Sequence, residues 1–307
     1  MGQKYDVIII GGGPAGLTSA IYTSRDRLAT LIIERGSFGG MINEAEIIEN
    51  YPGYADSVSG SELATQMHEQ AKRFGAKEVM ADVQTIKLED GCFTVMTDET
   101  HFVSKSIILA CGSEKRKLGV VGEREYLGKG VSYCATCDAA FFRNKIVAVV
   151  GGGNSALFEA LALSKFVRKV YVLHRREQFR ATSVVQERAL AEPKIELVYS
   201  TVVREIKGEE VVTGIAVENV RNNQVSNLAV DGLFIAVGMS PNTAFLKNII
   251  CLNEQGMIVV DERMRTSVQG VFAAGDVRQN SIGQVISAAG DGAVAAISAI
   301  KWVADMG

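Results

Sequence analysis

The feature that most constrains the fold of this chain is a glycine-rich segment that occurs twice, as IIIGGGPAG at 8–16 and as VAVVGGGNSA at 147–156. In each copy a β-branched run precedes three glycines. An apolar helical stretch and a second strand follow, ATLIIE at 29–34 and KVYVLH at 169–174. A strand, a tight glycine turn, a helix and a parallel strand form a βαβ unit. The sequence therefore predicts an α/β protein with two Rossmann-like dinucleotide-binding domains.

The order of the elements predicts that one domain interrupts the other. Each βαβ unit is followed by alternating runs that suit antiparallel strands, and then by an apolar strand ending in a small-residue turn, KSIILACG at 105–112 and LFIAVG at 233–238. The C-terminal segment is too short for a core of its own, so it must complete an earlier domain. We therefore expect a discontinuous first domain at 1–114 and 243–307, and an inserted second domain at 115–242.

The first glycine motif predicts a binding site for FAD. Gly11, Gly13 and Gly16 stand as G-x-G-x-x-G between a strand and a helix. In this pattern the first glycine allows a tight turn, the second lets a pyrophosphate approach the backbone, and the third lets the helix pack on the strand. Glu34 ends the second strand, where a carboxylate can accept hydrogen bonds from a ribose diol. The alternative is a tight turn that binds no ligand.

The second glycine motif predicts a site for NADPH. Its glycine positions are Gly151, Gly153 and Ala156. The strand that follows ends without an acid and leads into a basic segment, which contains His174, Arg175, Arg176 and Arg180. Guanidinium groups bind a 2′-phosphate through forked, charge-assisted hydrogen bonds, whereas a carboxylate would repel it. The alternative is that this segment is only a solvated charged face.

Between the two motifs stands a pair of cysteines, Cys134 and Cys137, followed directly by Asp138. A zinc site needs four ligands, and the sequence offers no second C-x-x-C and no close histidine pair, so we expect no metal. Two inert buried thiols are another alternative. A dithiol in a chain with FAD and NADPH sites has an electron donor, which favours a redox-active pair. Asp138 could then transfer the proton that thiol–disulfide exchange requires, or cap a short helix.

Composition and charge argue against several classes of partner. Lys and Arg together number 32 and Asp and Glu 35, which gives a net charge of −3. No basic run could follow a phosphate backbone, so we expect no nucleic-acid partner. We identify no apolar run of the roughly 18 to 20 residues that a membrane span requires, and no signal-peptide pattern before the first strand. We therefore expect a cytoplasmic protein without a membrane partner.

With these residues in view, the chain closely resembles the low-molecular-weight, bacterial-type thioredoxin reductases, which belong to the class II pyridine nucleotide-disulfide oxidoreductases. The resemblance runs nearly end to end, through GGGPAG, ENYPG (49–53), KGVSYCATCD (129–138), GGGNSA, HRREQFRA (174–181), SPNTAFL (240–246) and GVFAAGD (270–276). It implies an FAD domain split around an NADPH domain that carries the redox disulfide, and a homodimer. It also implies that Cys137 faces the flavin, that Cys134 attacks the partner's disulfide, and that Asp138 acts as acid and base.

The resemblance also assigns residues to each cofactor by matching position. Together with the motif itself, the FAD site comprises Gly11, Gly13, Pro14, Ala15, Gly16, Glu34, Arg35, Gly39, Gly40, Met41, Asn50, Gly275, Asp276, Gln284 and Val285. The NADPH site comprises Gly151, Gly153, Asn154, Ser155, Ala156, His174, Arg175, Arg176, Arg180 and Gly238. The chain departs from the family's usual residues at Met41, Ala140, Gly283 and Val285.

These observations predict a flavoprotein disulfide reductase. We expect electrons to pass from NADPH through FAD and the Cys134/Cys137 disulfide to oxidised thioredoxin or a thioredoxin-like small dithiol protein. Because the disulfide and the NADPH site share the inserted domain and both must reach one flavin, we expect two alternating domain orientations. One alternative is a reductase of the same family with another donor or partner, such as a peroxiredoxin-like or glutaredoxin-like protein or a small disulfide. A second is a non-catalytic, redox-sensing flavoprotein.

Overall fold

The computed structural model describes residues 3–45, 47–89 and 91–306, and the chain divides into two compact units. The first unit comprises Met1–Glu114 and Ser240–Gly307, and the second comprises Lys115–Met239. The chain thus returns from the second unit to the first at Ser240, before the predicted boundary at 242. Asn242 belongs to the first unit because its backbone N–H donates to Gly112 O (3.1 Å) and its side-chain amide to Cys111 O (2.8 Å).

A seven-stranded sheet forms the centre of the first unit. Its order is β3-β2-β1-β6-β5-β4, and β17 also pairs with β6. Strands β1, β2, β3, β6 and β17 pair in parallel, whereas β5 pairs antiparallel with both β6 and β4, as the alternating runs predict. The strands are β1 (Gln3–Ile10), β2 (Thr30–Glu34), β3 (Lys77–Met80), β4 (Val83–Glu89), β5 (Cys92–Thr97), β6 (His101–Leu109) and β17 (Val271–Ala273).

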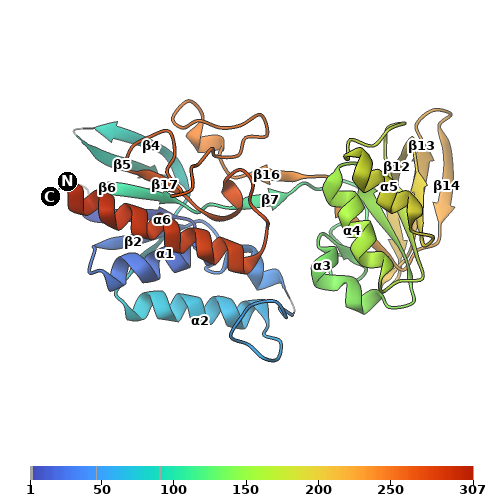
Figure 1. The fold of residues 1–307 in the computed structure, drawn as a ribbon, viewed down its shortest axis with the longest axis horizontal. Coiled ribbons are helices and arrows are strands. Elements are labelled where there is room, and N and C mark those ends of the chain that lie inside the picture. The colour runs from blue at the N-terminus through green and yellow to red at the C-terminus, as the bar shows by residue number, and fades with distance from the viewer. Residues whose placement is uncertain (1–2, 46, 90, 307) are drawn as a thin grey trace. The chain divides into compact units, whose positions relative to one another are not determined.

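Helices α1 (Pro14–Arg25), α2 (Gly60–Arg73) and α6 (Val285–Asp305) contribute to the core on one face of this sheet (Figure 1). Alternate residues of β1 point to opposite faces, so Val7 and Ile9 pack against the helices while Ile8 and Ile10 enter a second core. Three short 3₁₀ helices complete the unit, η1 (Gly40–Glu44), η3 (Ala244–Leu246) and η4 (Gly275–Val277).

Helix α6 corrects the expectation that no apolar run is long enough to span a membrane. Its 21 residues meet the length and composition of a span. Yet α6 packs closely on α1: a Cβ at Gly292 would lie 2.2 Å from Ala15 O. The small residues of α6 therefore serve helix packing inside the first unit.

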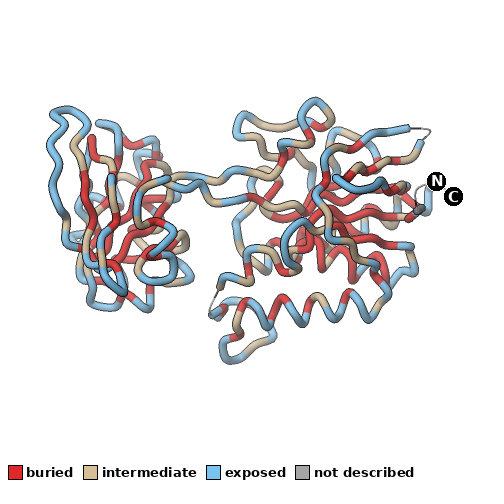
Figure 2. The backbone as a smooth tube through the Cα atoms, turned by 180° about the vertical axis from the view of Figure 1, so that it is seen from behind, coloured by how far each residue is buried: buried red, intermediate tan, exposed pale blue. Residues whose placement is uncertain are grey.

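The second unit has a parallel sheet of five strands in the order β11-β10-β9-β15-β8. These are β8 (Val131–Ser132), β9 (Ile146–Gly151), β10 (Lys169–Leu173), β11 (Ile195–Val198) and β15 (Gly232–Ala236). The helices are α3 (Ala135–Asp138), η2 (Ala139–Phe142), α4 (Asn154–Ser164) and α5 (Ser183–Ala191). Figure 2 shows the buried backbone concentrated at the centre of each unit.

A three-stranded antiparallel sheet covers the other face of the parallel sheet in the second unit. It consists of β12 (Thr201–Gly208), β13 (Val212–Asn219) and β14 (Gln224–Leu228). Ile206 and Ile215 from this sheet share a core with Ala148 and Val150 of β9. The two crossings between the units are themselves short paired strands, β7 (Ser113–Lys115) and β16 (Met239–Pro241). The prediction of two Rossmann-like α/β domains is therefore confirmed.

Candidate active site

The first glycine motif forms a tight turn between β1 and α1 with one open position. Gly11 has φ +107°, and a Cβ there would lie 2.2 Å from Ala110 O; a Cβ at Gly16 would lie 1.9 Å from Gly11 O. The chain's own packing therefore excludes side chains at these two glycines. A Cβ at Gly13 would meet nothing nearer than Gly39 O at 4.0 Å. Gly13 thus leaves a recess at the start of α1, where backbone N–H groups favour an anion.

Glu34 ends β2 beside this turn. Its carboxylate accepts hydrogen bonds from Gly12 N (2.6 Å) and Gly36 N (2.7 Å), which fixes it next to the motif. Gly39 N donates to Gly12 O (2.8 Å), so the loop after Glu34 also folds onto the glycine turn.

The remaining predicted residues of this loop have different surroundings. Gly40 lies against the motif, since a Cβ there would be 3.4 Å from Gly13 Cα. Met41 is 43% exposed. The guanidinium of Arg35 pairs with Glu114 near the first crossing, and this pair is exposed to solvent.

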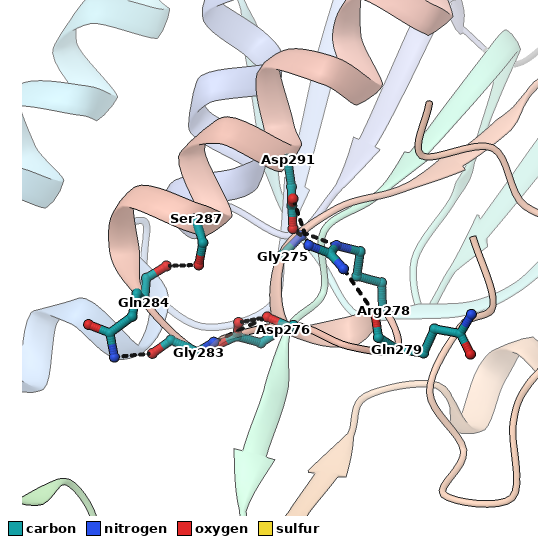
Figure 3. Close-up of polar contacts among 9 residues, drawn as sticks. Gly275, Asp276, Arg278, Gln279, Gly283, Gln284, Ser287 and Asp291 are labelled. Atoms are coloured by element: carbon teal, nitrogen blue, oxygen red, sulfur yellow. Dashed lines mark hydrogen bonds and ion pairs between the residues drawn. The ribbon is translucent and has the colours of Figure 1, made fainter. Parts of the chain in front are cut away.

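The C-terminal segment of the first unit contains a second set of predicted residues, of which Gly275 contacts the same turn. A Cβ at Gly275 would lie 2.9 Å from Ala15 Cβ, so η4 packs directly on the start of α1. Asp276 follows, and its carboxylate accepts a hydrogen bond from Ser281 Oγ (2.6 Å). Figure 3 shows Gly275, Asp276 and the start of α6, where Gln284 is the N-cap and Val285 the first helical residue. The Asn50 amide donates to Gln284 Oε1 (2.9 Å) across a long sequence separation.

A buried ion pair secures this segment, and the sequence reasoning missed it. Arg278 donates to Asp291 through Nε (2.6 Å to Oδ2) and Nη2 (2.8 Å to Oδ1), and Gly275 N also donates to Asp291 Oδ2 (3.2 Å). Asp291 is one of two acids in the Ala-rich helix α6, the other being Asp305 at its end, and nothing in the sequence identifies Arg278 as its partner. The pair is visible in the centre of Figure 3.

The second glycine motif repeats this geometry between β9 and α4. A Cβ at Gly151 would lie 2.4 Å from Ala236 O and 2.6 Å from Ala156 Cβ, whereas a Cβ at Gly153 would meet nothing within 4 Å. The open position is thus again the middle one, and Ala156 fits where the first motif has its third glycine. Asn154 and Ser155 are exposed on the first turn of α4.

The basic segment folds onto the second motif. Arg180 N donates to Gly152 O (2.7 Å), and Thr182 N donates to Asn154 Oδ1 (2.8 Å). The side chains of Arg175, Arg176 and Arg180 are exposed, and among the residues that the structure describes none forms an ion pair with them. Three guanidinium groups near an open glycine turn suit a ligand that carries an extra phosphate.

His174 lies beneath this segment and is buried. Its ring stacks on Phe179 (4.9 Å between centroids), and a Cβ at Gly152 would lie 2.0 Å from the ring. Burial, together with the charges of Arg180 and Arg176, lowers the pKa of His174. We infer that this imidazole is neutral near pH 7 and supports the glycine turn from behind.

Gly238, with φ +111°, ends the segment after β15, and its carbonyl accepts a hydrogen bond from Arg116 N (3.0 Å).

Cys134 and Cys137 form a disulfide with 5.3 Å between their Cα atoms. Cys134 is the N-cap of α3, and its Sγ accepts a hydrogen bond from Cys137 N (3.2 Å). Cys137 is exposed and Cys134 is half-buried. Asp138 ends this one-turn helix, so the four residues CATC and the following carboxylate form one compact group.

The hydroxyl of Ser132 joins this group. It lies 2.5 Å from Asp138 Oδ2 and 3.0 Å from Cys134 N. Sequence reasoning quoted Ser132 within KGVSYCATCD but gave it no role, because serine is common in loops and at strand ends. The only available signal was its place two residues before a redox-active cysteine.

Glu123 and Glu159, two carboxylates of the second unit, have pKa values shifted in opposite directions. Burial by itself would raise the pKa of Glu123. The hydrogen bond from Tyr133 (2.6 Å) and those from backbone N–H groups outweigh this effect and lower the pKa. Glu159 of α4 has the opposite environment: burial raises its pKa to about 7, against the charge of Lys115. Glu159 Oε2 finds no hydrogen-bond partner within the part of the chain that the structure describes.

Residues 5–292 match the family described as pyridine nucleotide-disulphide oxidoreductase. The thioredoxin reductase of Treponema pallidum is 45% identical over 303 residues, which cover 99% of this chain and 98% of that protein.

Two solved structures of thioredoxin reductases are also similar to this chain. A thioredoxin reductase from Streptococcus pyogenes has 43% identity and a TM-score of 0.91, with 99% of this chain and 100% of that chain covered. A thioredoxin reductase from Lactococcus lactis, described as the FR conformation, has 43% identity over 98% of this chain and 99% of that chain, but a TM-score of 0.70.

Proposed function

The chain belongs to the pyridine nucleotide-disulphide oxidoreductase family, and we propose that it is a thioredoxin-disulfide reductase that uses NADPH and FAD. The observation that carries the proposal is the Cys134–Cys137 disulfide, which is partly exposed and lies in the same unit as a dinucleotide motif bordered by three arginines. The full-length similarity to thioredoxin reductases supports thioredoxin as the partner.

The first unit has the features that FAD requires. Gly13 leaves space for a diphosphate, Glu34 ends β2 where a ribose would lie, and Gly275 packs on the start of α1. Asn50 bonds to Gln284 at the start of α6. We propose that the fifteen FAD residues named from the sequence, from Gly11 to Val285, hold this cofactor. When bound, FAD supplies two-electron transfer between a nicotinamide and a disulfide.

The second unit would hold NADPH. The open side of Gly153 would face the pyrophosphate, and Arg175, Arg176 and Arg180 would bind the 2′-phosphate. His174 would act from behind by supporting Gly152, since its ring is buried.

The exchange chemistry is assigned to Cys134, Cys137 and Asp138. In the reduced protein the thiol of Cys134 gives its proton to Asp138, and its sulfur attacks the partner's disulfide, which breaks and releases one partner thiolate. That thiolate takes a proton from the solvent, and the thiolate of Cys137 then attacks Cys134 Sγ. The second partner thiolate leaves and takes the proton from Asp138. Two electrons pass to the partner, and the Cys134–Cys137 bond forms again.

We propose that the two units alternate between two orientations, turning at β7 and β16. The disulfide and the predicted NADPH site share the second unit, and both must act on one cofactor in the first. The two solved relatives support this proposal, because structures of equal identity and nearly equal coverage score 0.91 and 0.70 against this chain. A difference of this size is what we expect if those two structures hold their domains in different arrangements.

The remaining parts of the proposal concern assembly and location. We propose a homodimer in the cytoplasm without nucleic-acid or membrane partners. The net charge of −3 and the packing of α6 inside the first unit support the last two points.

An anaerobic reductive titration with NADPH tests the function. We expect the purified protein to take up more than one two-electron equivalent, and the Cys137→Ser variant to take up one equivalent fewer. Adding thioredoxin disulfide should reoxidise the reduced protein, whereas a glutaredoxin-like protein should not. Uptake of a single equivalent by the unsubstituted protein would favour a non-catalytic flavoprotein. Turnover with another disulfide but not with thioredoxin would favour a reductase with a different partner.

A further inference from the structure

We propose that Arg221 is a specificity-determining residue of the NADPH site. Its guanidinium engages the carboxylate of Glu177, which leaves the three arginines of the basic segment available to a 2′-phosphate. This inference rests on the proposed function, because it explains how the proposed site would favour NADPH over NADH. The observation that carries it is the ion pair of Arg221 Nη1 with Glu177 Oε1 at 3.1 Å.

Glu177 is an acid in the middle of the basic segment. It directly follows Arg176 and precedes Arg180, and all three side chains are exposed. A carboxylate in this place opposes a 2′-phosphate in two ways. It repels the negative charge of the phosphate, and it can form a forked pair with a guanidinium that the phosphate needs. Binding of NADPH therefore benefits when a cation from outside the segment pairs with this carboxylate.

The backbone brings Arg221 to Glu177 through Ser200. Ser200 N donates to Arg176 O (3.1 Å), and Ser200 O accepts from Val220 N (2.7 Å). Ser200 is 5% exposed, so these two bonds lie inside the second unit. They connect the basic segment with the turn between β13 and β14, which contains Arg221.

The turn itself holds the backbone of Arg221 in place. Asn219 at the end of β13 pairs with Gln224 at the start of β14, and Arg221 N donates to Asn219 Oδ1 (3.0 Å). Within the described part of the chain, Arg221 is the cation that forms an ion pair with Glu177. The antiparallel strands, to which the sequence reasoning gave no part in the site, thus supply a charge to it.

Isothermal titration calorimetry of the oxidised, FAD-loaded protein with NADP⁺ and with NAD⁺ tests this inference. In Arg221→Gln we expect the Kd of NADP⁺ to rise about fivefold at low ionic strength, because the unpaired Glu177 then repels the phosphate and competes for its guanidinium partners. The Kd of NAD⁺, which lacks that phosphate, should change by less than about twofold.

Two further variants separate the effect of the carboxylate from a direct contact between Arg221 and the phosphate. Arg221→Lys keeps the cation and should keep most of the NADP⁺ affinity. Glu177→Gln/Arg221→Gln also lacks the acid, so its Kd should return to within about twofold of the unsubstituted protein. Arg204→Gln is the matched control, because Arg204 is an exposed arginine of β12 whose ion pair is with Glu218.

An unchanged NADP⁺ affinity in Arg221→Gln would overturn the inference. So would an equal loss in Arg204→Gln, which would indicate an effect of net charge alone. A double variant that binds NADP⁺ as weakly as Arg221→Gln would also overturn it, since Arg221 would then contact the phosphate itself. If the unsubstituted protein binds NADP⁺ no more tightly than NAD⁺, the assignment of NADPH in the proposed function fails, and this inference fails with it.

Discussion

Gly16 and Gly13 of the first motif have different surroundings, so replacing each by alanine should have different effects on stability. In Gly16→Ala the new methyl group would meet Gly11 O at 1.9 Å, so we expect a loss of about 3 kcal/mol in the free energy of unfolding. In Gly13→Ala the methyl group meets no protein atom closer than 4.0 Å. The free energy of unfolding of the flavin-free Gly13→Ala variant should therefore change by less than about 0.5 kcal/mol.

The same pair separates folding from cofactor binding. If the recess at Gly13 receives the FAD diphosphate, Gly13→Ala should bind FAD roughly tenfold to a hundredfold more weakly. Urea unfolding of the flavin-free protein measures the stability, and a flavin fluorescence titration measures the affinity. Unchanged affinity in Gly13→Ala would argue against a diphosphate at this position.

The buried carboxyl group of Glu159 makes the stability of the fold depend on pH. Burial raises its pKa from 4.5 to about 7, so between these values the folded protein keeps a proton that the unfolded chain releases. Stability should therefore fall as the pH rises through this window, by on the order of 2 kcal/mol. Glu159→Gln cannot ionise and should remove this dependence in urea unfolding at pH 5 and pH 8. The exposed Glu187→Gln serves as the control, and equal slopes in both variants would contradict the prediction.

At the scale of elements, the ion pair between Arg278 and Asp291 connects η4 to α6. The two side chains are 14% and 9% exposed, so removing one leaves a buried charge without its partner. We expect Arg278→Leu to lower the free energy of unfolding by about 3 to 5 kcal/mol. In the double variant Arg278→Leu/Asp291→Asn no buried charge remains and Gly275 N keeps an acceptor, so at least half of the loss should be recovered.

The exposed pair of Arg265 and Asp261 provides the comparison. Their side chains are 62% and 42% exposed, and Arg265→Leu should cost less than about 1 kcal/mol. Urea unfolding of the unsubstituted protein, Arg278→Leu, Asp291→Asn and the double variant completes the cycle for the buried pair. Strictly additive losses in the Arg278/Asp291 pair would show that the two side chains are not coupled.

The elements also show what could be predicted from the sequence. Both βαβ units and the C-x-x-C pair are local patterns in which residue type and spacing have direct chemical meaning, so their prediction succeeded. The bonds of Asn50 with Gln284 and of Arg278 with Asp291 depend on how loops return to the sheet, which no local pattern encodes. His174 illustrates the intermediate case: its place next to the arginines was evident, but its burial beneath Gly152 depends on packing.

At the scale of the whole molecule, the division into units sets the main requirement on turnover. The chain crosses between the units only through β7 and β16, whose pairing is continued by the bonds of Arg116 N to Gly238 O and of Asn242 N to Gly112 O. Gly112 and Gly238 have φ of +63° and +111°, values that side chains rarely adopt. Both crossings therefore contain a glycine where a change of backbone direction is least hindered.

Alternation between two orientations predicts two distances between labels on different units. Cys251 is exposed in the first unit, and Val225→Cys offers a site in the second, where Val225 is 61% exposed. Cys92→Ser removes a competing thiol, while burial raises the pKa of Cys111 to about 12 and keeps it unreactive. Doubly labelled protein, mixed with excess unlabelled protein to avoid transfer between subunits, should show two energy-transfer populations whose ratio changes when NADPH is added. A single population that does not respond to NADPH, in protein that still turns over, would mean that the units do not alternate.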